Sequence, residues 1–322
     1  MRLVNRIALA LCLVVTARWA SAQTFPEKPI RIVIPYATGG GTDNLLRIIT
    51  PEVSAALGQQ IIIDAKPGGA SIMGTEFVAR SAPDGYTILA TENAFFVNPT
   101  LFKTKMPFDT EKSFTGVTML AHAPVVLVVH PSVQAKTLPE LLKLIREKPG
   151  ALNFASAGIG TSTHLAGELF MLETKTSMTH VPYKGTGSMM ADLTAGQVNI
   201  GFVGLSSSRA FIESGRLRAL AVTGEKRNPG VPDVPTFAEA GVPNIDADTY
   251  WGLYAPAGVN PAHVATINKA FVTALRNPAY AERLATLGFL PIANSAPDHT
   301  LQLKTLIKRW GGVIEQAKVT VE

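Results

Sequence analysis

The chain has 322 residues, 47% of them apolar, and a formal net charge of +5. This length and apolar content exclude a disordered or fibrous protein and suit two lobes of roughly 100–150 residues each. Lysines and arginines are scattered along the chain, so its charge does not indicate a surface for nucleic acid.

The first 22 residues have the features of an export signal. Arg2 and Arg6 precede an apolar run at residues 7–15, and small residues follow at 20–22. We therefore expect cleavage after Ala22 and a periplasmic mature protein. A membrane anchor is the weaker alternative, because spanning a bilayer takes roughly 20 apolar residues.

Cleavage there changes the charge and the cysteine content. Removing Arg2, Arg6 and Arg18 lowers the net charge from +5 to +2. The one cysteine, Cys12, also leaves with the signal. We expect no disulfide and no cysteine-bound metal in the mature chain.

Apolar, β-branched runs alternate with helical patterns along most of the remaining chain. This alternation is typical of βαβ units in a mainly parallel sheet. Thr137 with Glu140 predicts a helix capping box, and Asn260 and Asn277 each predict a cap before a first-turn proline. The expected strands are residues 30–34, 60–64, 86–91, 124–130, 152–156, 178–182, 198–203 and 217–223.

The order of elements predicts two lobes. Residues 124–245 can form a βαβ lobe of their own, and the chain after Asp246 is mostly helical and too poor in strands for an independent domain. We expect a signal peptide at 1–22, a first lobe at 23–123 and 246–322, and a second lobe at 124–245. The chain would cross between the lobes twice and leave a cleft between them.

The strongest local motif is the glycine-rich run at residues 35–43, between the first strand and a helix. Its glycines let backbone amides approach a ligand, and unpaired amides at a helix N-terminus favour an anion. Alternatively, Thr42 or Asp43 caps the helix and the glycines form a tight turn. The candidate ligand contacts here are Tyr36, Ala37, Thr38, Gly39, Gly40, Thr42 and Asp43.

A second glycine-rich run lies at residues 156–164, between a strand and a helix of the second lobe. Two such loops, one from each lobe, would direct donors into one cleft. The candidate contacts from this run are Ser156, Gly160 and Thr161. A further strand exit offers Tyr183 with nearby amides, although a capped turn explains it equally well.

The sequence contains no known catalytic motif with the required residues at the required spacing. The run from Gly160 approaches a nucleophile elbow, but the elbow requires glycine where His164 stands. No phosphate loop or dinucleotide fingerprint occurs. The six histidines are at least eight residues apart, so no helical pair of metal ligands exists. We predict no catalytic residue, no metal and no cofactor.

Six segments along the chain carry a family pattern. They are the run at 35–43, Pro-Asp-Gly-Tyr-Thr at 83–87, Phe-Ala-Ser with two following glycines at 154–161, His-Leu-Ala-Gly-Glu-Leu-Phe at 164–170, His-Val-Pro-Tyr-Lys-Gly at 180–185 and Leu-Arg-Ala-Leu-Ala-Val-Thr at 217–223. Together they resemble the Bug family, the substrate-binding proteins of tripartite tricarboxylate transporters. The resemblance spans essentially the whole mature chain. It implies a type II periplasmic-binding fold, a carboxylate ligand in the interlobe cleft and two membrane permease subunits as partners.

One departure from the family concerns Val203. The family often has aspartate after the phenylalanine that corresponds to Phe202, and that aspartate is associated with polar or amino groups of the ligand. Valine favours an apolar ligand body, so we expect an aromatic or alkyl mono- or dicarboxylate to outrank citrate or aspartate. Arg209 either lies on the surface or pairs with a second ligand carboxylate.

Aromatic residues complete the expected site. Tyr36, Phe95 and Tyr183 would pack on the carbon atoms of the ligand, and Trp251 would lie near the lobe crossing. We expect a monomer that binds a small organic carboxylate and transporter permease subunits, and no nucleic acid. Two alternatives stay open, a receptor that signals to a membrane sensor kinase and a hydrolase, which would need a base beside Ser162.

Overall fold

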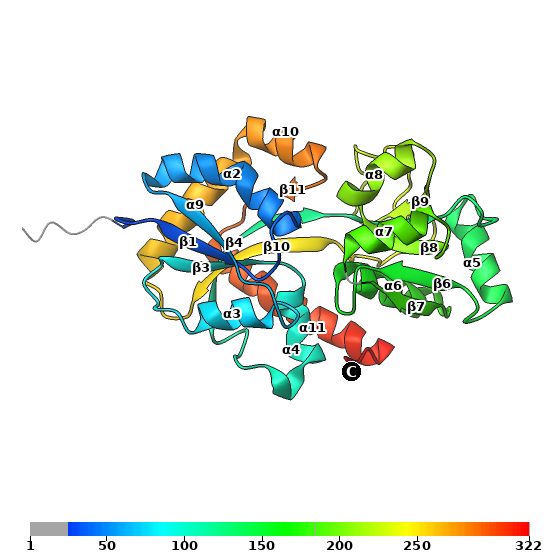
Figure 1. Cartoon of the computed structure of the whole chain (residues 1–322), viewed down its shortest axis with the longest axis horizontal. Coiled ribbons are helices and arrows are strands. Elements are labelled where there is room, and N and C mark those ends of the chain that lie inside the picture. The colour runs from blue at the N-terminus through cyan, green and yellow to red at the C-terminus, as the bar shows by residue number, and fades with distance from the viewer. Residues whose placement is uncertain (1–24, 184, 322) are drawn as a thin grey trace, which may run out of the picture.

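The computed structural model describes residues 25–183 and 185–321 and contains two β-sheets, each covered by helices (Figure 1). The predicted signal segment, residues 1–22, lies outside the described residues. No helix within the described ranges is long and apolar enough to cross a lipid bilayer.

The first sheet has the strand order β11-β4-β10-β3-β1-β2. Its strands are β1 (Ile30–Ile34), β2 (Ile61–Ala65), β3 (Thr87–Thr91), β4 (Phe114–Ala123), β10 (Thr249–Pro256) and β11 (Leu290–Pro291). β1 pairs in parallel with β2 and β3, whereas β10 lies antiparallel between β3 and β4. β4 therefore runs in the direction of β1. The accompanying helices are α2 (Gly41–Leu57), α3 (Ile72–Ala79), α4 (Ala94–Leu101), η1 (Lys103–Lys105), α9 (Pro261–Arg276), α10 (Pro278–Thr286) and α11 (Ala296–Ala317).

The second sheet has the order β7-β6-β8-β5-β9. Its strands are β5 (Val125–Val129), β6 (Asn153–Ser156), β7 (Thr179–Pro182), β8 (Ile200–Gly204) and β9 (Arg218–Val222). β6 pairs in parallel with β7 and β8, and β5 lies antiparallel between β8 and β9. The helices of this lobe are α5 (Leu138–Glu147), α6 (Ser162–Thr174), α7 (Thr186–Thr194) and α8 (Leu205–Glu213).

The two sheets share one layout. Each has three parallel strands, then an antiparallel strand that follows a crossing from the other sheet, then a strand in the original direction. The first crossing is at Pro124, between β4 and β5, and the second lies between β9 and β10. Most strands of each sheet run in one direction, which confirms the predicted two-lobed α/β fold. The exact lobe boundaries stay a prediction.

Local signals explain most element boundaries. Glu140 N–H donates to Thr137 Oγ1 at 3.4 Å, which caps α5 as predicted. Asn260 and Asn277 accept the amides of Ala262 and Ala279 at 2.9 and 3.1 Å, so both predicted asparagine caps are confirmed.

β4 is absent from the strands expected from the sequence. Its ten residues include a glycine and two alanines, which have low β propensity, and only Pro124 separates it from the apolar run of β5. β5 was easier to predict because it is a run of valines and leucine that is buried throughout.

α11 joins the two lobes. It packs on β4 and α4 of the first lobe and on α6 of the second. The large hydrophobic cluster that contains the fully buried Trp310 of α11 also contains Tyr254 of β10 and Phe154 of β6. Figure 1 shows α11 extending toward the second lobe. The lobes therefore share buried apolar surface in addition to the two crossings.

Candidate ligand-binding site

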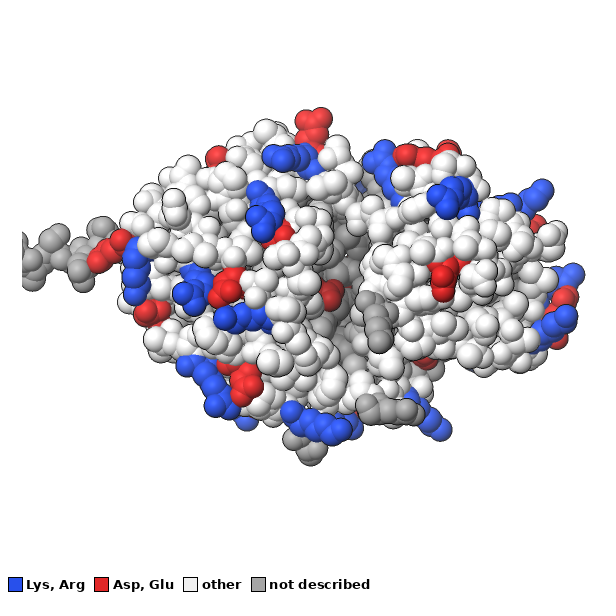
Figure 2. All heavy atoms as spheres, viewed as in Figure 1, with Lys and Arg blue, Asp and Glu red and all other residues white. Residues whose placement is uncertain are grey.

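Loops of both lobes border a hollow between the two sheets, which Figure 2 shows as a furrow in the surface. A Cβ added to Gly160 of the second lobe would lie 2.7 Å from Leu101 Cδ1 of the first. A Cβ on Gly288 of the first lobe would lie 3.3 Å from Ser206 N of the second. Open α/β sheets bind ligands outside the carboxyl ends of their parallel strands, and the loops after β1, β3 and β6 begin at those ends.

The loop between β1 and α2 is the most exposed part of this border. Ala37, Thr38 and Gly40 are exposed, and Gly39 has φ of +82°, which favours glycine. A Cβ on Gly41 would lie 3.1 Å from Trp251 Cζ2, so the indole lies directly beneath the start of α2. Glycine is thus required at Gly39 by the backbone turn and is favoured at Gly41 by the close approach of the Trp251 ring.

Asp43 stabilises this loop from inside. Its Oδ2 accepts the Gly39 N–H at 2.8 Å and the Arg47 Nε–H at 2.9 Å. Burial opposes ionisation, but these hydrogen bonds keep the pKa of Asp43 below its usual value. The side chains of Asp43, 2% exposed, and Thr42 are both buried and do not reach the open face of the loop. Asp43 therefore stabilises the loop and is not in a position to contact a ligand.

Several backbone amides of the loop have no acceptor, which indicates an anion-binding site. Gly40 is the N-cap of α2 and provides no side-chain cap. Among the described residues, the amides of Ala37, Thr38 and Gly40 donate no hydrogen bond. The first-turn amides of α2 have no acceptor within the helix. Together these groups and the positive end of the helix dipole can hold one carboxylate.

The end of β3 adds a polar floor. The hydroxyls of Tyr36 and Thr91 share a hydrogen bond of 3.0 Å, and Glu92 N–H donates to Tyr36 Oη at 3.4 Å. Tyr36 follows β1 in the chain, and these two hydrogen bonds hold its hydroxyl at the end of the neighbouring strand β3. Glu92 was not expected from the sequence, although an acidic residue directly after a buried strand end was a usable signal.

The loop between β6 and α6 satisfies most of its own donors. Ala157 N–H donates to Thr163 Oγ1 at 2.9 Å, and Gly160 N–H donates to His164 Nδ1 at 3.1 Å. Thr161 is the N-cap of α6 and its hydroxyl donates to Gly158 O at 2.7 Å. This loop consequently offers fewer free amides than its glycines suggested.

An imidazole pair, the buried His164 and the half-buried His180, lies behind that loop. The His164 and His180 rings stack with centroids 3.9 Å apart, and Ser156 Oγ lies 2.6 Å from His180 Nε2. Burial, together with His164, lowers the pKa of His180 to about 3. Ser156 is fully buried, so it supports the loop and its hydroxyl is not open to a ligand.

The hydrolase alternative lacks its base. Ser162 Oγ shares a hydrogen bond of 2.6 Å with Thr249 Oγ1, and no imidazole or carboxylate among the described residues bonds to it. Within the described ranges there is also no group of three or more side chains that could hold a metal ion. The arrangement is suited to binding.

Four predicted contacts have side chains that are buried or bonded within their own lobe. Phe95 is 3% exposed and packs against Tyr254, with ring centroids 4.2 Å apart. Val203 is fully buried in the core of the second lobe, so the inference about the ligand that rested on its side chain lacks a geometric basis. The hydroxyl of Tyr183 donates to Asp192 Oδ2 at 2.8 Å.

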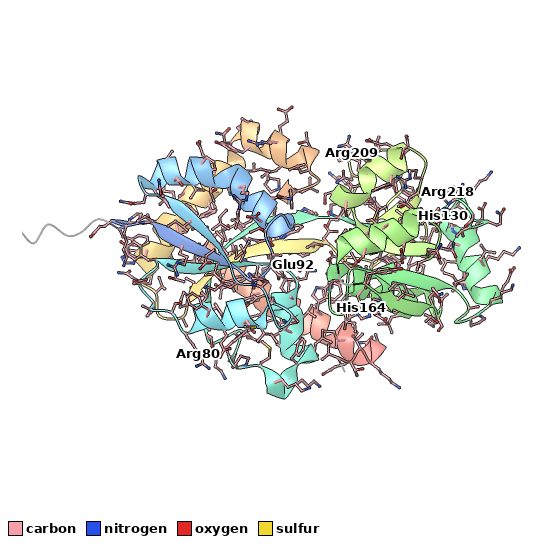
Figure 3. The ribbon with its side chains drawn as sticks, in the orientation of Figure 1. Arg80, Glu92, His130, His164, Arg209 and Arg218 are labelled. Carbon is pink, nitrogen blue, oxygen red and sulfur yellow. The ribbon has the colours of Figure 1, made fainter. Side chains whose placement is uncertain are left out.

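Arg209 is the fourth. Its Nε donates to Glu213 Oε1 at 2.8 Å, and its side chain is 42% exposed. Figure 3 shows it at the edge of the second lobe. The hypothesis that Arg209 binds a second ligand carboxylate is therefore not supported by its position, because its partner is on the same helix.

Other hollows lie elsewhere. A shallow groove of about 650 Å³ runs between α7 and α8, with Met190, Phe211 and Arg216 among its lining residues. The groove is outside the loops described above, and none of its described lining residues is a buried polar residue.

Most of this chain matches a known protein family. Residues 45–319 match the family described as "Tripartite tricarboxylate transporter family receptor". Protein BugT of Bordetella pertussis is 32% identical over 317 residues, covering 98% of this chain and 97% of BugT.

Two solved structures from Rhodopseudomonas palustris are also similar. Rpa4515, solved with adipate, has a TM-score of 0.83 and 31% identity over 92% of this chain and 99% of its own. MatC, solved with bound malate, has a TM-score of 0.78 and 32% identity over 90% of this chain and 100% of its own. Because the family match covers most of the chain and BugT is 32% identical over 98% of it, the chain belongs to the Bug-type receptor family of tripartite tricarboxylate transporters, whose members are solute-binding receptors and not enzymes.

Proposed function

We propose that this receptor is a periplasmic protein that captures a small carboxylic acid between its lobes and delivers it to the permease subunits of a tripartite tricarboxylate transporter. The observation that carries the proposal is the set of free amides in the exposed β1–α2 loop, at the N-terminus of a 17-residue helix. Such a terminus binds anions through its N–H groups and its dipole.

The proposed contacts divide between the lobes. The amides of Ala37, Thr38 and Gly40 hold one carboxylate, and Tyr36 forms the floor beside them. Thr161 and the backbone near Gly160 close the site from the second lobe. In this arrangement Trp251 supports the anion loop from below and does not touch the ligand.

The proposed ligand class is an alkyl or aromatic mono- or dicarboxylate. Support comes from the similar Rpa4515, which was solved with adipate, an alkyl dicarboxylate, and from MatC, which was solved with malate. The ring of Tyr36 can pack on the carbon chain of such an acid. The proposal also includes cleavage after Ala22 and a monomeric mature chain.

A thermal-shift screen tests this function. The mature protein would be scanned with adipate, malate, succinate, benzoate and citrate, with the neutral adipamide as control. An acid at about 100 times its Kd stabilises the folded state by roughly 2.7 kcal/mol, which raises Tm by several degrees. Stabilisation by at least one acid and none by adipamide is expected, and the absence of any shift would contradict the proposal.

A further inference from the structure

Glu92 occupies a fixed position at the base of the hollow. It directly follows β3, and Figure 3 shows it between the two lobes. The next residue, Asn93, is fully buried and bonds to the second crossing in two ways, donating to Asp248 O at 3.0 Å and accepting Tyr250 N–H at 2.7 Å. The backbone at Glu92 is therefore anchored where the lobes meet.

The carboxyl group of Glu92 lacks a cationic partner. Among the described residues it has no ion pair and no hydrogen bond from a side chain, and it accepts one from the backbone N–H of Asn93, which favours its charged form. Its near polar neighbour is Tyr36, whose hydroxyl already bonds to Thr91. Burial raises the pKa of Glu92 to about 7, and burial together with the Glu92 charge raises the pKa of Tyr36 well above its usual value.

This position conflicts with an anionic ligand if Glu92 is ionised. The β1–α2 loop that would hold a carboxylate begins at Tyr36. The hydroxyl of Tyr36 accepts the backbone N–H of Glu92 at 3.4 Å, and burial together with the charge of the Glu92 carboxyl group raises the pKa of that hydroxyl. Two like charges in one poorly solvated site favour protonation of one of them. A protonated carboxyl group then offers an O–H donor in place of a repelling charge.

We propose that Glu92 is protonated in the ligand-bound receptor and donates a hydrogen bond from its carboxyl group to the bound acid, so that capture of the anion takes up one proton from solvent. This inference rests on the proposed function. It identifies Glu92 as a residue that selects ligands by their charge. An amine-bearing ligand paired with ionised Glu92 would give the opposite result, release of a proton.

Other titratable groups near this site either have hydrogen-bond or ion-pair partners or keep one protonation state near neutral pH. Tyr36 stays protonated throughout the neutral range because its pKa is raised. Lys66, after β2, lies 3.5 Å from Asp64 and over the ring of Phe77. Behind Asn93, the groups are the hydrogen-bonded pair His122 and Asp248 and the half-buried Tyr250.

Calorimetric titration measures the proton directly. The mature protein would be titrated with the acid among adipate, malate and benzoate that gives the largest thermal shift, at pH 7, 7.5 and 8. Each titration would be repeated in buffers with different ionisation enthalpies. These acids are fully ionised in this range, so any proton taken up binds to the protein. We expect uptake that approaches one proton per site at pH 8 and a Kd that rises about fivefold from pH 7 to pH 8.

Two variants assign the proton. Glu92→Gln keeps a hydrogen-bond donor but cannot titrate, so it should bind at pH 8 more tightly than the parent, with no Glu92-linked uptake and a flat pH profile. Glu282→Gln changes an exposed glutamate of α10 and should behave like the parent. The parent titrations need no variant, so a poorly folded Glu92→Gln protein would not remove the test.

The outcomes separate this inference from the proposed function. Binding by the parent with no proton uptake, with proton release, or with uptake that persists in Glu92→Gln would overturn the role of Glu92 and leave carboxylate capture intact. Failure of all three acids to bind at every pH would overturn the proposed function, and this inference with it.

Discussion

His122 Nδ1 and Asp248 Oδ2 lie 2.5 Å apart and join the two crossings between the lobes. His122 belongs to β4, just before the first crossing, and Asp248 precedes β10, at the end of the second. The other oxygen of Asp248 accepts the hydroxyl of Thr223, which in turn accepts Val125 N–H at 2.9 Å. One carboxylate thus links His122 directly to Thr223 and, through the Thr223 hydroxyl, to Val125, across both crossings.

Replacing this carboxylate should weaken the whole fold. Asp248→Ala leaves the buried hydroxyl of Thr223 and the imidazole of His122 without their shared acceptor, so we expect a loss of about 3 kcal/mol in the free energy of unfolding. Asp248→Asn keeps one acceptor and should lose less. Urea unfolding curves measure both, and an unchanged midpoint for Asp248→Ala would show that the stability of the fold does not depend on this residue.

Trp251 should report ligand binding. It lies under Gly41 at the start of the anion loop and is 8% exposed, with its ring 5.0 Å from that of Phe289. Trp310 is fully buried in the cluster around α11. Ligand-dependent fluorescence should be lost in Trp251→Phe and persist in Trp310→Phe. The reverse pattern would indicate that binding changes the packing of α11 and not the loop.

Acid should destabilise the fold partly through His180. Its pKa is lowered to about 3 in the folded protein, below its ordinary 6.5. The folded state therefore stays neutral while the unfolded chain takes up a proton. This contribution to stability is complete above pH 6.5 and is lost as the pH falls toward 3.

His180→Phe keeps an aromatic ring beside Phe154 and cannot titrate. Between pH 7 and pH 5 the variant should lose about 1 kcal/mol less stability than the parent, after allowance for the partial exposure of His180. Buried His299, whose pKa is also lowered to about 3, acts in the same direction in both proteins. Equal losses of Tm in both proteins over this range would refute the role of His180.

The sequence predicted the fold well where burial is local. The apolar runs of β1 and β5 are buried as expected, and the helix caps at Thr137, Asn260 and Asn277 are present. β10 was not among the strands expected from the sequence, and its antiparallel direction could not be predicted either. It depends on a pairing with β3 and β4 that lie more than a hundred residues earlier.

The site was harder to predict because side-chain direction depends on distant contacts. Glu92 is held at the hollow through Asn93 and Asp248, which are 155 residues apart in the chain. Val203 follows the strand pleat into the core. For Arg209 the sequence did hold a signal, because Glu213 stands four residues later, the spacing of an ion pair on a helix surface.

The most direct test of the central claim is calorimetric binding of the best acid from the screen to the parent and to Gly40→Val. Gly40 has φ of −77°, and a Cβ there would meet only Ala37 O, at 3.5 Å, so the fold should survive while the valine blocks close approach of a carboxylate to the loop. Gly312→Val, in α11, has open space around the added Cβ and is the control. We predict that Gly40→Val weakens binding at least about 100-fold, as expected for the loss of two charge-assisted hydrogen bonds, and that Gly312→Val binds like the parent. A Gly40→Val protein that is folded and binds its acid as tightly as the parent would contradict the account.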